Sequence, residues 1–340
     1  MSRSRLPLLR GCHRLCLTPV RNERWIIEPF IAAARMWADR VIVADQGSDD
    51  GTREFLEGTP GVDLHPNPSS RYDEAERQRL LLSAARRVEG PRFLLGLDAD
   101  EALSANCAAS ADWSRIAAAA PGTIVRFRWV NLLPGLREAW IPPGRTAFGF
   151  VDDGTPHEGR TIHSPRVPCP KGAPVLDLDD LVVLHFQFTA WERMRSKQRW
   201  YQAWELLERG RGPLEIFRRY HHMHGGWPEG EIVPVNPAWL GDFSRRGVRY
   251  DRLKPEALTW WDREVVNLLR RHGPARFRRL AIWDRDWNAV AARLADDFPR
   301  LDDPRGAGER IVHALLARTQ GRRGSWPVRG LESALRLSGW

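Results

Sequence analysis

The stretch Leu94-Leu95-Gly96-Leu97-Asp98-Ala99-Asp100-Glu101 is a short apolar run that stops at acidic residues, with Asp98 and Asp100 spaced i, i+2. An apolar run without polar alternation is typical of a strand buried on both faces. Open α/β sheets bind their ligands at the carboxyl ends of such strands. A second run, Val41–Ala44, also ends in an acid, Asp45. Two strand ends that each carry Asp predict a site for a hard cation and a polar ligand such as a nucleotide.

The first half of the chain alternates strand-like and helix-like segments. The predicted strands are 13–18, 41–44, 62–64, 92–97 and 123–130, and the predicted helices are 25–38, a short one opening near Thr52, and 73–88. This order favours an α/β, Rossmann-type, mostly parallel sheet with right-handed crossovers and helices on both faces.

The second half of the chain changes character. Residues 131–176 are rich in Pro and Gly, which predicts loops and irregular hairpins, and a strand over 181–184 ends at His185. From 190 onward the pattern is helical, and a helix over 256–272 stops at Gly273-Pro274. The predicted division is therefore a tail at 1–10, an α/β domain over 11–190, and a mainly helical region over 191–340.

Composition sets broad limits. The 340 residues carry a net charge of +9, but the basic residues are spread along the chain and almost all are Arg, so composition alone leaves nucleic acid, anionic substrates and membrane surfaces open as partners. No stretch of about 20 apolar residues occurs, so no transmembrane helix is expected. The four cysteines, Cys12, Cys16, Cys107 and Cys169, form no CxxC pair, which predicts buried, reduced thiols and a cytoplasmic protein.

Several motifs, taken in order, resemble the family-2 nucleotide-sugar glycosyltransferases of the GT-A fold. The matching segments are Arg21-Asn22-Glu23, similar to the RNE of many members, Val41–Thr52, similar to the vvDdgStDgT segment, Arg77-Gln78 with Ala84, and Asp98–Glu101, similar to the DxD motif with its trailing acid. The resemblance covers about 14–101 well and continues loosely to about 190. It implies a GT-A domain over 11–190 and a lid or acceptor-side role for 191–340.

The resemblance also implies roles for these residues. Breaking a sugar–phosphate bond requires charge stabilisation on the departing diphosphate, which a divalent cation supplies. Asp100 is then a ligand of Mn²⁺ or Mg²⁺, and Asp98 contacts the ribose or a metal-bound water. Asp45 accepts hydrogen bonds from the base, Glu23 from base or ribose, and Arg77 clamps a phosphate. A strand-to-loop turn that is merely acidic is the alternative for Asp98 and Asp100.

Two further residues follow from their places downstream of the acids. His185 is expected to complete the metal shell and would favour Mn²⁺ over Mg²⁺, the alternative being a hydrogen-bonded core histidine. Glu158, in an HE pair with His157, is expected to be the general base towards an acceptor hydroxyl. Asp152 and Asp153 are its rivals, and a loop salt bridge is the alternative role.

Other charged residues are expected to be structural. Asp49 and Asp50 are expected to cap the helix that opens at Thr52, while Glu101 fits a helix-start acid as well as an indirect role at the metal. The cluster His221-His222-Met223-His224-Gly225-Gly226 fits no metal-ligand spacing. The alternating Arg193, Arg195, Lys197 and Arg199 are expected to be mostly solvated, although Lys197 could reach a diphosphate.

The prediction is a metal-dependent, inverting glycosyltransferase of the hexosyltransferase type, using a nucleoside-diphosphate sugar, with UDP-sugars favoured. Its acceptor, a glycan, lipid or small molecule, is not identified, and nucleic acid is not an expected partner. The expected location is cytoplasmic, with a possible peripheral contact at the inner face of the membrane. The alternatives are a nucleotidyltransferase of nucleotide-sugar synthesis, against which the absence of a Gly-rich loop after 13–18 counts, and a non-catalytic basic nucleic-acid-binding or scaffold protein.

Overall fold

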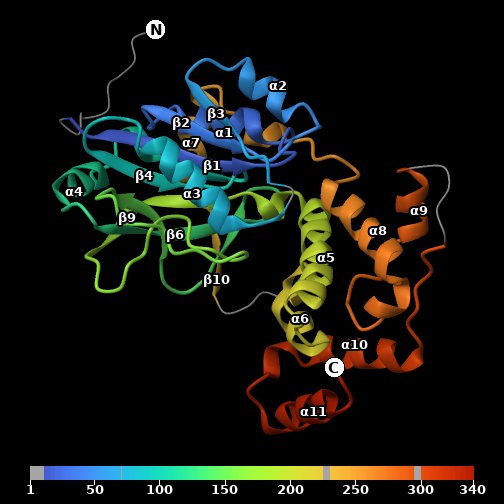
Figure 1. Cartoon of the computed structure of the whole chain (residues 1–340). Helices are drawn as coiled ribbons and strands as arrows, with labels where there is room; N and C mark the ends of the chain where they lie inside the picture. The colour runs from blue at the N-terminus through green and yellow to red at the C-terminus, as the bar shows by residue number, and fades with distance from the viewer. Residues whose placement is uncertain (1–10, 70, 225–229, 295–299) are drawn as a thin grey trace. The chain divides into compact units, whose positions relative to one another are not determined.

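The chain divides into two compact units in the computed structural model, which describes residues 11–69, 71–224, 230–294 and 300–340 (Figure 1). The first unit runs to Thr189 and includes residues 230–255, and the second comprises residues 190–229 and 256–340. Residues 230–255 therefore belong to the α/β unit, although the sequence-based division assigns them to the helical region. The predicted tail at 1–10 lies outside the described residues.

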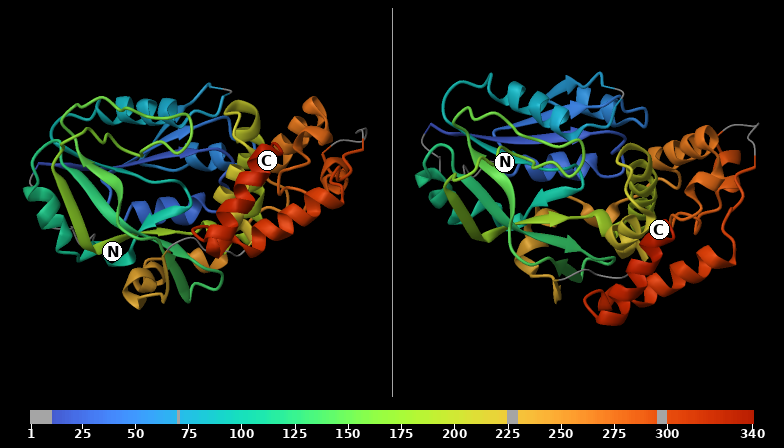
Figure 2. Two further views of the ribbon diagram at one scale, coloured as in Figure 1. Left: turned by 90° about the horizontal axis from the view of Figure 1, so that it is seen from below. Right: turned by 60° about the horizontal axis from the view of Figure 1, so that its bottom comes forward.

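Four parallel strands form one half of the sheet in the first unit. They are β1 (His13–Val20), β2 (Arg40–Asp45), β3 (Val62–Pro66) and β4 (Arg92–Gly96), in the order β3-β2-β1-β4. The connections carry α1 (Ile27–Ala34), α2 (Thr52–Glu57) and α3 (Glu74–Ala85). The predicted α/β architecture, with helices on both faces of the sheet, is confirmed (Figure 2).

Burial explains the alternation of strands and helices. Leu15 and Leu17 of β1 are fully buried and share one core cluster with Leu81 and Leu82 of α3. Because successive strand residues point to opposite faces, Leu15 and Leu17 mark the face that α3 covers.

The other half of the sheet is mixed. Its strands are β5 (Glu101–Leu103), β6 (Ile124–Leu132), β7 (Glu138–Ile141), β8 (Thr146–Val151), β9 (Val175–His185) and β10 (Glu231–Pro234). β8 lies antiparallel between β4 and β6, while β6 runs parallel to β9. A Cβ at Gly149 would lie 2.9 Å from the ring of Phe93, so this glycine lets β8 approach β4. The unit is completed by α4 (Asp112–Ala118) and α7 (Pro237–Arg245).

The second unit is helical, as predicted for most of 191–340. Its helices are α5 (Trp191–Glu208), α6 (Pro213–Tyr220), α8 (Trp260–His272), α9 (Trp287–Ala292), α10 (Ala307–Arg318) and α11 (Trp326–Leu337). α8 begins with a capping box between Thr259 and Asp262, and it ends at Gly273, whose φ of 75° favours glycine.

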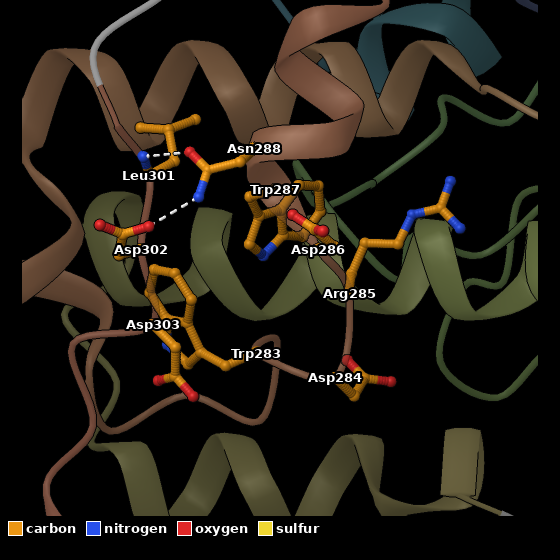
Figure 3. Close-up of a pocket in the computed structure, with 9 residues that line it drawn as sticks. All are labelled: Trp283, Asp284, Arg285, Asp286, Trp287, Asn288, Leu301, Asp302 and Asp303. Carbon is orange, nitrogen blue, oxygen red and sulfur yellow. Dashed lines mark hydrogen bonds between the residues drawn. The ribbon is translucent and has the colours of Figure 1, made fainter.

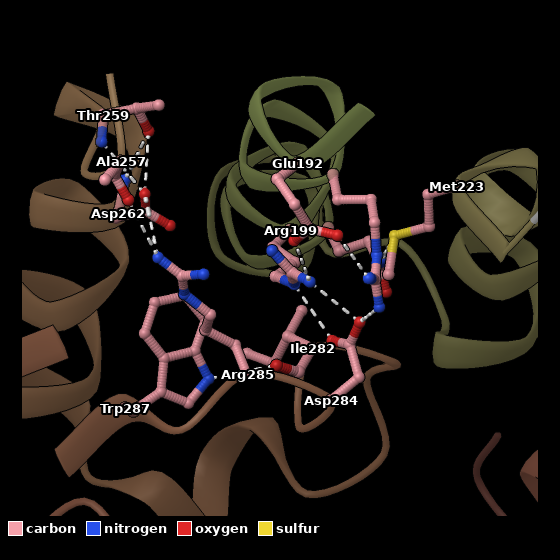
Figure 4. A network of polar contacts seen from close by, with 12 residues as sticks. Glu192, Arg199, Met223, Ala257, Thr259, Asp262, Ile282, Asp284, Arg285 and Trp287 are labelled. Carbon is pink, nitrogen blue, oxygen red and sulfur yellow. Dashed lines mark hydrogen bonds and ion pairs between the residues drawn. The ribbon is translucent and has the colours of Figure 1, made fainter. Parts of the chain in front are cut away.

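The basic residues of α5 are not a solvated face, so that prediction is wrong. Arg199 is 1% exposed, and its guanidinium donates to both carboxylate oxygens of Asp284 at 2.9 and 2.8 Å (Figure 4). Arg193 is also buried, and its guanidinium lies 4.4 Å from the ring centroid of Trp261. Acidic side chains and aromatic rings from distant parts of the chain pair with these guanidinium groups. The spacing of charged residues in the sequence does not predict such distant partners.

The cysteines follow the prediction only in part. Cys16 and Cys107 are buried, and desolvation raises the pKa of both thiols, that of Cys107 to about 12. Cys12 is half-buried and Cys169 is exposed, so the expectation of burial is wrong for Cys169. All four are free thiols. Over the described ranges, no helix combines the length and the apolar character needed to cross a bilayer.

Candidate functional site

The loops that follow β1 and β2 are joined into one layer at the carboxyl edge of the sheet. Asn22, with φ 56°, donates from Nδ2 to Asp49 Oδ1 at 2.6 Å, and its Oδ1 accepts from the Asp49 backbone N–H at 2.8 Å. The Glu23 backbone N–H donates to Thr52 Oγ1 at 2.9 Å. Asparagine tolerates the left-handed region better than most residues, so Arg21-Asn22-Glu23 can make this tight turn.

Asp50 and Asp49 have structural roles in this layer. Asp50 Oδ1 accepts from the backbone N–H and the hydroxyl of Thr52 at 3.0 and 2.6 Å, at the start of α2. Gly51 is the N-cap residue of α2, so Asp50 contacts the first turn from the position before the cap, while Asp49 holds Asn22.

Asp45 ends β2 with no exposed surface. Its Oδ2 accepts from Arg53 Nε at 2.9 Å, and its Oδ1 accepts from the Ser48 backbone N–H at 3.2 Å. Sequence reasoning missed Arg53 as a partner. The carboxylate is therefore fixed in place at the strand end where a nucleotide base is expected.

Glu23 and Arg77 are half-buried, on separate elements of the same unit. Glu23 Oε2 accepts from the indole N–H of Trp25 at 2.8 Å. The guanidinium of Arg77 lies 4.5 Å from the ring centroid of Tyr72. Both side chains are thus oriented by an aromatic neighbour.

Two side chains that follow β2 and β3 carry buried polar atoms without a partner. Gln46 and Asn67 are 5% and 6% exposed. Gln46 Nε2 donates to the carbonyls of Ser69 and Arg71 at 2.9 and 2.7 Å, but its Oε1 finds no donor among the described residues, and neither does Asn67 Nδ2 find an acceptor there. A buried amide atom left unsatisfied costs free energy, so these atoms favour a polar ligand at this edge. Sequence reasoning missed both residues.

The acids after β4 are shared with an arginine from the Pro/Gly-rich segment. Arg166 Nη2 lies 3.0 Å from Asp98 Oδ2 and donates to Glu101 Oε1 at 2.6 Å, while Glu101 is fully buried. Burial disfavours the charged form of Arg166, but the two carboxylates overcome this effect and raise the pKa of its guanidinium above the ordinary value. A Cβ at Gly96 would lie 2.9 Å from the Arg166 carbonyl oxygen, so Gly96 allows this segment to lie against β4. Sequence reasoning missed Arg166 as well.

Asp100 takes a different partner, His185 at the end of β9. Glu101 and His185 are register partners of the antiparallel pair β5–β9, which brings His185 Nε2 to 3.6 Å from Asp100 Oδ2. His185 Nδ1 lies 2.7 Å from Asn131 Oδ1, and the Asn131 Nδ2 lies 3.5 Å from the Trp129 carbonyl. When Asn131 Oδ1 accepts from the Nδ1–H of the imidazole, Nε2 is the ring nitrogen that faces Asp100. The ring also stacks on Trp129, with centroids 4.9 Å apart.

This pair fits a divalent cation bound together with a phosphate ligand. One carboxylate and one imidazole supply two protein ligands, and Mg²⁺ or Mn²⁺ at such sites takes its remaining ligands from substrate phosphates and water. A His whose other nitrogen is held by an amide oxygen is the usual arrangement of a metal-binding imidazole. In the part of the chain that the structure describes, no group of three or more His, Cys, Asp or Glu side chains could hold a metal alone. The acids and His185 therefore do not form a closed structural metal site.

Glu158 is exposed on a loop that returns to the carboxyl edge of the sheet. A Cβ on the next residue, Gly159, would lie 2.5 Å from that of Ala75, in the first turn of α3. The alternative general bases, Asp152 and Asp153, lie elsewhere in the unit. The Asp152 backbone N–H donates to the Arg92 carbonyl at 2.9 Å, at the amino end of β4, and its carboxylate is bound by Arg92 at 3.0 Å. Asp153 follows Asp152 at that same end, so both lie away from the acids after β4.

Two features of the second unit do not make a catalytic site. His221, His222 and His224 have lowered pKa values, about 4 for the first two, because of burial. A hollow of about 290 Å³ is lined by residues 283–288 and 301–303 (Figure 3). Asn288 of this lining is already engaged, since it accepts from the Leu301 backbone N–H and donates to Asp302, each at 2.7 Å. Gly225 and Gly226 of the His-rich motif lie outside the described residues.

Comparison with known proteins gives limited similarity. No protein-family model and no curated protein matches the sequence. Among solved structures, the chain is similar to the fragment 1-349 of S. aureus TarS, at 13% identity and a TM-score of 0.33, over 92% of each chain. It is also similar to a 4-diphosphocytidyl-2C-methyl-D-erythritol synthase, at 11% identity and a TM-score of 0.27, over 69% of this chain and 97% of the other.

Proposed function

We propose that the first unit is an inverting glycosyltransferase of the hexosyltransferase type that binds a nucleoside-diphosphate sugar, with UDP-sugars favoured, and one Mn²⁺ or Mg²⁺ ion. The observation that carries the proposal is the Asp100–His185 pair, oriented by Asn131 at the carboxyl edge of the sheet. When bound, the cation offsets the negative charge that develops on the departing diphosphate. Imidazole ligation favours Mn²⁺ over Mg²⁺.

Residues around this pair would hold the donor. Asp45, fixed by Arg53, is assigned to the base, and the unpartnered atoms of Gln46 and Asn67 support a nucleoside at that edge. Arg166 uses Nη2 for Asp98 and Glu101, which leaves other N–H groups of its fork for a diphosphate oxygen. Asp98, Glu23 and Arg77 are assigned the roles that the sequence implies: the ribose or a metal-bound water for Asp98, the base or ribose for Glu23, and a phosphate for Arg77.

Glu158 is assigned the role of general base. Its carboxylate is exposed and makes no hydrogen bond or ion pair with any described residue, so it is free to take a proton from an acceptor hydroxyl. The position of Gly159 against Ala75 supports a place near the carboxyl edge of the sheet. His157, whose pKa is lowered by burial, stands beside it as a neutral ring.

The test is calorimetric binding of UDP and UDP-sugars with and without Mn²⁺. The wild-type protein should bind UDP in a Mn²⁺-dependent manner, and Asp100→Asn should abolish that dependence. Asp63→Asn is the matched control, because Asp63 lies near the start of β3 and pairs with Arg40 at 3.3 Å. Equal UDP affinity in wild type and Asp100→Asn would refute the assignment.

The same assays separate the alternatives. A nucleotidyltransferase would release pyrophosphate from UTP and a sugar 1-phosphate, whereas a glycosyltransferase would release UDP from a UDP-sugar. A basic nucleic-acid-binding protein would bind RNA in a strongly salt-dependent manner and would be insensitive to Asp100→Asn.

A further inference from the structure

Large apolar side chains are exposed on two consecutive helices of the second unit. Trp326 and Leu337 of α11 are 81% and 92% exposed, and Ile311 and Leu315 of α10 are 59% and 38% exposed. Both helices already have a core-facing side: Leu316 of α10 and Leu335 of α11 belong to one buried cluster with residues of α6. The exposed apolar side chains are therefore not part of the buried core that these helices share.

Helix geometry places these residues on continuous outer faces. Trp326 and Leu337 are eleven positions apart, which at 3.6 residues per turn brings them within about 20° of the same direction. The buried residues of α11, Val328 and Leu335, lie on the opposite side. On α10, Ile311 and Leu315 are one turn apart and form a single row.

The charge on these faces is of one sign. Arg318, Arg322 and Arg329 are exposed, and none of their guanidinium groups pairs with an acid in the described ranges. The single acid between residues 310 and 340 is Glu332, which is 14% exposed at its side chain and bound by Arg218 at 2.8 Å. No carboxylate thus neutralises the outer surface of α11.

We propose that the outer face of α10 and α11, formed by Ile311, Leu315, Arg318, Trp326, Arg329 and Leu337, docks peripherally on an anionic membrane surface. An indole and leucine side chains insert at the headgroup level of a bilayer, while arginines contact lipid phosphates. A second copy of the chain fits less well, because association through this face would bring like charges together. The proposal does not depend on the glycosyltransferase assignment.

Flotation of the full chain with liposomes tests the proposal. Vesicles of phosphatidylcholine with about 30 mol% phosphatidylglycerol should bind the protein, and vesicles of phosphatidylcholine alone should bind it weakly. Arg318→Gln/Arg329→Gln should lower binding about twenty-five-fold, since each arginine near an anionic surface contributes about fivefold. Arg87→Gln/Arg252→Gln, exposed arginines of the first unit, remove the same charge and should leave binding within about twofold of wild type.

The apolar contribution needs its own variant. Trp326→Ser/Leu337→Ser should lower binding more than tenfold without changing the melting temperature, because both side chains are exposed. The control, Ile232→Ser, removes an apolar side chain that is 49% exposed on β10 of the other unit. Equal loss in this control would overturn the proposal. RNA binding that competes with vesicles and ignores Trp326→Ser/Leu337→Ser would also overturn it, as would dimerisation that these variants abolish.

Discussion

Asn131 offers the sharpest test of how His185 is used. Its Oδ1 lies 2.7 Å from His185 Nδ1, and it is 1% exposed, so it acts on the site only through the imidazole. Replacing such an orienting residue costs about 10–100-fold in metal affinity. By the conversion of about 1.4 kcal/mol per tenfold, Asn131→Ala should weaken Mn²⁺ binding by about 1.4–2.8 kcal/mol.

A second substitution, Asn131→Asp, should change the Mn²⁺ affinity in the opposite direction. Asn131→Asp keeps the acceptor oxygen but adds a negative charge, which raises the basicity of the imidazole and attracts a cation. Asn131→Asp should therefore tighten Mn²⁺ binding while lowering the stability of the metal-free protein, since a buried carboxylate is desolvated. The measurement is the electron paramagnetic resonance signal of free Mn²⁺ during titration with UDP present.

A purely structural histidine makes different predictions for the same variants. If His185 only packs in the core, Asn131→Ala should lower the unfolding free energy by about 1–3 kcal/mol for the unsatisfied N–H, and neither Asn131→Ala nor Asn131→Asp should change the Mn²⁺ affinity. Gln202→Ala in the second unit removes a buried amide whose Oε1 accepts from the Ala281 backbone N–H at 3.1 Å, and it controls for general loss of stability. Equal Mn²⁺ affinity in wild type, Asn131→Ala and Asn131→Asp would refute the reasoning.

Four further predictions concern the first unit. Asp45→Ala should weaken UDP and UDP-sugar binding alike, by about 1–3 kcal/mol in calorimetry, and a donor-bound structure with Asp45 out of hydrogen-bond reach of the nucleoside would exclude the role. Glu158→Gln should lower kcat about 10²–10⁴-fold with donor affinity unchanged, whereas near-normal turnover would exclude it as the base. Arg166→Gln should weaken UDP binding more than Mn²⁺ binding, and unchanged UDP affinity would remove it from the donor site. Asp152→Asn should lower the unfolding free energy by about 3 kcal/mol near pH 7 in urea titrations, because the carboxylate is buried with two arginines. Desolvation acts against ionisation of Asp152, but the two arginines lower the pKa of its carboxyl in the folded state. The carboxylate therefore contributes fully to the free energy of unfolding above about pH 4, the ordinary pKa of Asp. This contribution is lost as the pH falls through the lower pKa of the folded state. A pH-independent difference between Asp152→Asn and wild type would contradict this account.

Local patterns in the sequence were sufficient for the parallel half of the fold. Apolar runs fixed β2 and β4, and the residue after each run placed Asp45 and Asp98 at the carboxyl edge. The strand expected at 181–184 was also present, as the end of the longer β9 (Val175–His185). These features depend on neighbours in sequence, so periodicity and turn residues are enough to predict them.

The sequence did not predict which charged side chains pair with residues far away along the chain. Arg166 pairs with Glu101 across 65 positions and lies in a Pro/Gly-rich segment without periodicity. Arg199 pairs with Asp284 across 85 positions, and this partner converts an apparently solvated helix position into a buried one. Such pairs are set by the tertiary fold, and a charge alone gives no sign of whether its partner is water or a distant carboxylate.

The charges at the edge of β4 argue for one exchangeable cation. Three acidic side chains, Asp98, Asp100 and Glu101, meet one guanidinium, that of Arg166, and burial raises the pKa of the Glu101 carboxyl. The guanidinium is covalently part of the chain and occupies Asp98 and Glu101, so Asp100 is the carboxylate left to pair with His185. A divalent cation at Asp100 would offset acidic charge that Arg166 does not reach, and a diphosphate bound with it could accept from the N–H groups of Arg166 that Asp98 and Glu101 do not use. This division explains why one acid pairs with an imidazole while the two beside it share an arginine.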